Sequence, residues 1–79
     1  MSEKARIAPE ELSALVDDGQ RQKLRMLLNE EHPADIAEWL TDLDKSHRLS
    51  CFRLLDLDNA SAVLAELEPE TQGNLLKDL

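Results

Sequence analysis

Apolar side chains recur along the chain with the spacing of amphipathic helices. Leu12, Leu15 and Val16 follow the i, i+3, i+4 pattern, and similar stripes return in every later segment. Prolines, a glycine and short acidic residues separate the stripes, as expected where helices begin and end. The pattern predicts six short helices, at about residues 9–18, 20–29, 33–42, 45–55, 59–67 and from 69 onward.

Single residues mark the ends of these helices. Each of the three prolines falls where a helix is expected to begin. Proline lacks a backbone N–H group, and in the first turn of a helix that group would have no partner within the helix. Gly19 favours the left-handed backbone that closes a helix. Asp44 and Asp58 are predicted to cap the helices that follow them, because a short carboxylate accepts hydrogen bonds from free backbone N–H groups.

The second half of the chain contains a repeat. Residues 32–55 match residues 56–79 at an offset of 24, so that Leu40 falls on Leu64, and charged positions match as well. A repeat of this length is one helical hairpin, the unit of an α-solenoid. Residues 8–31 fit the repeat weakly, as terminal repeats often do.

The fold that follows is all-α, with short helical hairpins stacked in the manner of an armadillo-like solenoid. Leucine supplies most of the apolar surface and Val and Ile are scarce, which disfavours a sheet. We predict a polar lead-in at residues 1–7 and a helical-repeat domain of three hairpins at residues 8–79. Trp39 and Leu40 lie on one stripe and are expected in the core.

The last predicted helix carries Leu75, Leu76 and Leu79, and only part of this stripe can pack back on the preceding helix. A finished solenoid ends in a repeat with a polar outer face. The sequence therefore predicts that the chain is part of a longer domain. The alternative is that the outer face of this last helix forms a contact between copies of the chain. Taken alone, it is expected to be a monomer or a weak dimer.

The net charge is −8, which argues against nucleic acid and against anionic membrane surfaces as partners. No apolar run has the length of a membrane span and no secretory signal is present, so a cytoplasmic location without direct membrane insertion is expected. Arg21, Lys23 and Arg25 form a small basic patch. We interpret it as balancing nearby acidic residues, which are Asp17, Asp18, Glu30 and Glu31.

Carboxylates gather at the ends of the predicted hairpins. Magnesium prefers hard oxygen ligands, keeps several waters and often uses only one or two carboxylates. These groups could hold the ion weakly or complete a site with a partner, although helix caps and solvated helix ends are the interpretation the positions favour. The acidic residues are Asp42, Asp44, Asp56, Asp58, Glu66, Glu68 and Glu70.

The remaining candidate residues for chemistry are the two histidines and the single cysteine. His32 precedes a proline and is expected in a turn, and neither histidine has a partner at zinc spacing. His47 lies one turn before Cys51, which would allow a nucleophile and base pair. We interpret Cys51 instead as a buried hydrophobe in a reducing compartment. The sequence predicts no enzyme.

The run His-Pro-Ala-Asp-Ile-Ala-Glu at residues 32–38 resembles the opening of the cytoplasmic N-terminal domain of MgtE-type magnesium transporters. The resemblance extends over about 50 residues, and the ordered combination of its pieces is more specific than any one of them. The further matching stretches are residues 52–55, 62–64, 66–67, 69–70, 72 and 75–76.

This resemblance implies a right-handed α-superhelix that acts as a regulatory module. In the family, the domain precedes a pair of CBS domains and a dimeric membrane channel, and magnesium bound between the N-domain and the CBS pair keeps the pore closed. The family's acidic contacts to magnesium lie largely in later helices, so the resemblance assigns no metal ligand to a residue of this chain. The alternative is a stand-alone interaction module similar to the armadillo domain of the flagellar motor switch.

Overall fold

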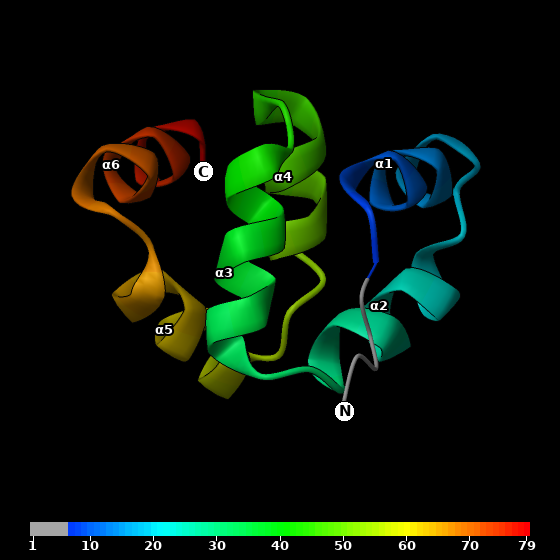
Figure 1. The fold of residues 1–79 in the computed structure, drawn as a ribbon, viewed down its shortest axis with the longest axis horizontal. Helices are drawn as coiled ribbons and strands as arrows, with labels where there is room; N and C mark the ends of the chain where they lie inside the picture. The colour runs from blue at the N-terminus through cyan, green and yellow to red at the C-terminus, as the bar shows by residue number, and fades with distance from the viewer. Residues whose placement is uncertain (1–6) are drawn as a thin grey trace.

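The computed structural model describes residues 7–79, and these residues form α-helices joined by short turns (Figure 1). No strand occurs in this range, which confirms the all-α prediction. The predicted lead-in at 1–7 lies outside the described residues except for Ile7, which packs against the core. The helices are α1 (Pro9–Asp17), α2 (Arg21–Asn29), α3 (Pro33–Asp42), α4 (Lys45–Phe52), α5 (Leu57–Glu66) and α6 (Pro69–Asp78).

The predicted start and stop signals work as expected in α1, α3 and α6. A proline opens each of these helices. Gly19 follows α1 with φ +70°, the left-handed conformation. Its N–H group donates to the Val16 carbonyl at 3.1 Å, and the Gln20 N–H group donates to Leu15 at 3.0 Å. This pair of bonds is a Schellman motif, which satisfies the carbonyl groups at the end of α1.

Helix α4 ends at Phe52, three residues before the predicted end. The N–H group of Leu54 donates to the Cys51 carbonyl at 3.0 Å, and that of Leu55 donates to Phe52 at 3.1 Å. These bonds span three residues instead of four, so the chain tightens into a closing turn. Leu55 is buried as predicted, but it reaches the core from this turn and not from the helix.

Helix α5 begins at Leu57, two residues earlier than predicted, and its N-cap is Asp56. The prediction that Asp58 caps this helix is therefore wrong. The N–H group of Asp56 donates to the side-chain carbonyl of Asn29 at 2.9 Å, a contact from α2 that the local sequence does not reveal. Asp58 lies in the first turn, where its negative charge interacts favourably with the positive end of the helix dipole.

The hairpins stack side by side. The α3–α4 hairpin stands in the centre, with α1 and α2 on one side and α5 and α6 on the other (Figure 1). Each helix of one hairpin packs against its counterpart in the next: α1 on α3, α2 on α4, α3 on α5 and α4 on α6. This arrangement agrees with the repeat seen in the sequence and confirms the stacked helical architecture. The right-handed superhelix remains a prediction.

The core follows the apolar stripes. In α3, Ile36, Ala37, Trp39 and Leu40 are all buried, so the core position predicted for Trp39 is confirmed. The remaining buried side chains come from all the other helices and from the closing turns. They are Leu12, Leu24, Leu28, Leu43, Cys51, Phe52, Leu55, Val63, Leu67 and Leu75.

Equivalent repeat positions are not equally covered. Leu40 is fully buried, whereas Leu64 is only partly buried against the core. The difference arises because α3 contacts both α1 and α5, while α5 has its main contact with α3. On α6, Leu75 is buried, but Leu76 and Leu79 are 51% and 55% exposed. Part of this last stripe is packed and part is open, but α6 has its main contact with α4 and not, as the sequence suggested, with the preceding helix.

Leu40→Ala is expected to lower the free energy of unfolding by roughly 2–5 kcal/mol, because it leaves a cavity in the central hairpin. Leu57→Ala is the matched control, since Leu57 is 81% exposed at the start of α5. We expect that variant to stay within about 0.5 kcal/mol of the parent. Urea unfolding followed by circular dichroism measures both. Equal losses in the two variants would contradict the assignment of the core.

Candidate functional site

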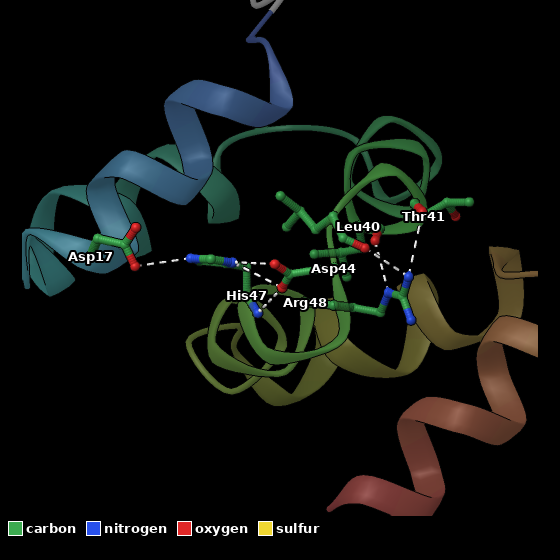
Figure 2. Close-up of polar contacts among 7 residues, drawn as sticks. Asp17, Leu40, Thr41, Asp44, His47 and Arg48 are labelled. Atoms are coloured by element: carbon green, nitrogen blue, oxygen red, sulfur yellow. Dashed lines mark hydrogen bonds and ion pairs between the residues drawn. The ribbon is translucent and has the colours of Figure 1, made fainter.

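A polar cluster at the start of α4 joins this helix to α1. Asp44 is the N-cap, and its carboxylate accepts the backbone N–H group of His47 at 2.9 Å, which confirms the predicted cap. The same carboxylate lies 2.9 Å from Nδ1 of the His47 ring. The ring nitrogen on the other side, Nε2, lies 2.9 Å from an oxygen of Asp17 in α1 (Figure 2). The imidazole therefore bridges two helices.

The electrostatics of this cluster favour the charged form of the histidine. Hydrogen bonds to Asp17 and then to Asp44 raise the pKa of His47 above its ordinary value. The backbone N–H group of His47, followed by its ring, lowers the pKa of Asp44. The two carboxylates are about two-thirds exposed, so water screens the interaction. Within residues 7–79, these are the only ion pairs.

Arg48, the next residue of α4, closes the end of α3. Its Nε donates to the Leu40 carbonyl at 2.9 Å (Figure 2). One Nη donates to the Leu43 carbonyl at 2.8 Å. A longer contact of 3.4 Å reaches the carbonyl of Thr41. A guanidinium group placed on the last carbonyls of a helix satisfies unpaired acceptors and favours the negative end of the dipole. Arg48 thus holds the turn between the two helices of the central hairpin in place.

Among the carboxylates that the sequence singled out, the structure brings only one pair close to other acidic groups. Asp42 and Asp44 line a shallow groove beside α1, together with Glu10 and Asp17. The ring of His47 already occupies the space between Asp17 and Asp44. In the part of the chain that the structure describes, no three potential ligands come together around one point. The acidic residues of the later turns are all exposed, namely Asp56, Asp58, Glu66, Glu68 and Glu70.

The nucleophile and base pair considered for His47 and Cys51 does not form. Cys51 is fully buried, and burial raises the pKa of its thiol to about 11, so the thiol stays protonated at neutral pH. Both ring nitrogens of His47 face carboxylates instead of sulfur. His32 is the exposed N-cap of α3, in the turn where the sequence placed it.

Sequence reasoning missed Asn29, which ties α2 to the turn between α4 and α5. Its amide nitrogen donates to the Leu54 carbonyl at 3.1 Å. Its oxygen accepts the backbone N–H group of Asp56 at 2.9 Å and the side chain of Asn59 at 2.7 Å. An asparagine at a predicted helix end signals a cap, but nothing local identifies partners so far along the chain.

The basic patch of α2 does not pair with the acidic residues expected to balance it. Arg21, Lys23 and Arg25 are exposed and form no ion pair with any residue between Ile7 and Leu79. Arg21 and Arg25 instead line a groove between α1, α2 and the end of α4. None of the helices in this range has the length and apolar character needed to cross a membrane.

The stacked hairpins and their cross-helix polar contacts define the class of the protein, a small α-helical repeat domain. A family model described as the MgtE intracellular N domain matches residues 31–79. Because this match covers more than half of the chain, the chain belongs to the MgtE intracellular N domain family, and the resemblance seen in the sequence is confirmed. The match spans α3 to α6.

This family is the N-terminal domain of MgtE magnesium transporters, a regulatory transporter domain and not a known family of enzymes. The family's description places the domain inside the cell. No curated protein and no solved structure matched the chain.

Asp17→Asn is expected to lower the pKa of His47, because it removes the strongest contact that favours the imidazolium. Asp18→Asn is the matched control, since Asp18 follows Asp17 and makes no contact with His47. The raised pKa means that the charged ring stabilises the fold below pH of about 6.5 and that this contribution is lost as pH rises through the raised value. NMR titration of the ring protons and thermal melts across this range measure both effects. Equal titration in the two variants would contradict the bridge.

Cys51 is expected to resist thiol reagents in the folded protein, because the side chain is buried and its thiol is protonated. Labelling with a disulfide reagent should follow global unfolding as urea is raised. Complete and rapid labelling of the native protein, with circular dichroism unchanged, would show that the thiol is accessible. That result would contradict the burial of Cys51 in the core.

Proposed function

We propose that this chain is a cytoplasmic regulatory module of a magnesium transporter and takes part in magnesium-dependent gating through contacts with CBS domains. The observation that carries the proposal is the family match over α3 to α6. The membrane domain of the parent transporter and its CBS pair are the proposed partners. The proposed parent is a homodimer on the cytoplasmic side of the cell membrane.

Magnesium fits this proposal as a shared ion and not as a resident cofactor. The candidate carboxylates of this chain are exposed at the hairpin ends, and each end offers two or three of them. Mg²⁺ keeps most of its waters and commonly uses one or two protein carboxylates. A site assembled from one surface of this chain and one surface of a partner would therefore be weak on either side alone.

Charge gives a physical reason for the gating step. The chain carries a net charge of −8, so it repels an acidic partner surface at short range. A divalent cation between the two surfaces converts repulsion into attraction and shifts the equilibrium toward the docked state. When magnesium falls, the docked state loses this contribution and the domains separate. The alternative, a stand-alone interaction module, requires no such dependence on metal.

The isolated chain is expected to bind Mg²⁺ with a dissociation constant near or above the millimolar range, since residues 7–79 offer no closed set of ligands. NMR titration of the labelled chain should give small shifts confined to the acidic hairpin ends. Adding the CBS-domain pair of an MgtE transporter should make these shifts saturate at lower magnesium. NaCl at equal ionic strength serves as the control for nonspecific screening.

Two results would contradict the proposal. Saturable binding of Mg²⁺ at micromolar concentration by the chain alone would place a complete site within it. Binding of the CBS pair that is equally tight in EDTA and in magnesium would remove the gating role and favour the stand-alone interaction module.

A further inference from the structure

A groove with a basic rim lies between α1, α2 and the end of α4. Arg21 and Arg25 line it from α2, and Arg53 lines it from the residue that follows α4. Its apolar lining includes the partly buried side chains of Leu15, Val16 and Leu54. We call this surface, defined by these six residues, the arginine groove.

The arginine groove stands out against the charge of the rest of the chain. The protein has 17 acidic and 9 basic residues, yet no acidic side chain of residues 7–79 lines this surface. The three guanidinium groups are exposed and form no ion pair or hydrogen bond within the same residues. The groove on the other side of α1 has the opposite character, with Glu10, Asp17, Asp42 and Asp44 in its lining.

We propose that the arginine groove binds an acidic amphipathic helix of a partner protein. The leucine and valine side chains of the floor would receive the apolar stripe of such a helix, which is a common mode of peptide recognition. Arg21 and Arg25 are four residues apart on α2, so their side chains lie one turn apart on one face. Carboxylates one turn apart on the bound helix match this spacing, and guanidinium groups bind carboxylates in a two-pronged geometry.

The size and chemistry of the groove favour a peptide over other anions. Its volume of about 1040 Å³ far exceeds that of a phosphate group. No aromatic residue of the described chain lines it, so it lacks the stacking surfaces that single-stranded nucleic acids use. The overall charge of −8 also repels a long polyanion more than a short acidic segment. Magnesium plays no part in this contact, so the proposal is independent of the gating function.

The test uses the full chain in EDTA and a synthetic helical peptide of roughly four turns, with leucines at i, i+3, i+4 and i+7 and glutamates on both flanks. NMR titration should shift the arginine side-chain signals and the methyl groups of Leu15, Val16 and Leu54. A second peptide with lysine in place of every glutamate should not bind. Rising salt should weaken the complex, as expected for exposed ion pairs.

Three charge reversals on α2 locate the binding surface. Arg21→Glu and Arg25→Glu should each weaken peptide binding about fivefold or more. Lys23→Glu makes the same change of charge on the same helix, but Lys23 does not line the groove, so this variant should bind as the parent does. All three side chains are exposed, and circular dichroism checks that each variant keeps its helical content.

The proposal is overturned if the acidic peptide does not bind, or if Lys23→Glu weakens binding as much as Arg25→Glu. It is also overturned if inorganic phosphate shifts the same arginines and displaces the peptide at comparable concentration, because the groove would then be a simple anion site. Sedimentation of the chain without peptide tests whether a second copy of the chain occupies the groove. Self-association that Arg25→Glu abolishes would assign the groove to a second copy of the chain.

Discussion

The burial of α3 between its neighbours is the interaction on which the rest of the structure depends. The helices have 8 to 10 residues each, a length at which an isolated helix is not stable in water. Each one must therefore gain its stability from packing. Helix α3 contacts α1, α4 and α5, and it contributes more buried residues than any other helix. Helix α4 contacts α1, α2 and α6 as well, so the two helices of the central hairpin together join the outer hairpins.

Polar contacts at the helix ends then select one arrangement of the packed helices. Arg48 holds the end of α3 against α4, Asn29 holds the end of α2 against the turn before α5, and Gln72 of α6 donates to the Leu64 carbonyl of α5 at 2.6 Å. Each contact satisfies a backbone group that a short helix leaves free at its end. In a stack of short helices such ends are frequent, so these few side chains carry much of the specificity of the fold.

How far the sequence predicts this structure depends on the range of the signal. Local signals succeeded: the prolines opened their helices, Gly19 closed α1, and Asp44 capped α4. The errors and omissions occur where a side chain makes contacts with residues far away in the sequence. The N-cap position of α5 is Asp56 and not Asp58, and the N–H group of Asp56 donates to Asn29 of α2. The bridge between Asp17 and His47 likewise joins residues of different hairpins. Periodicity gives the buried face of a helix, but it does not give the register between hairpins that creates these contacts.

The same limit applies to the charges of α2. In the sequence, its basic residues stand among acidic neighbours, which suggested local balance. In the fold, Arg21 and Arg25 line one groove together with Arg53, while Asp17 lines the other groove and contacts His47. Helix α1 thus lies between two grooves of opposite charge, one lined by arginines and the other by carboxylates. An acidic domain can in this way offer one surface that attracts cations and another that attracts carboxylates, so two partners of different chemistry can bind without competing for the same side chains.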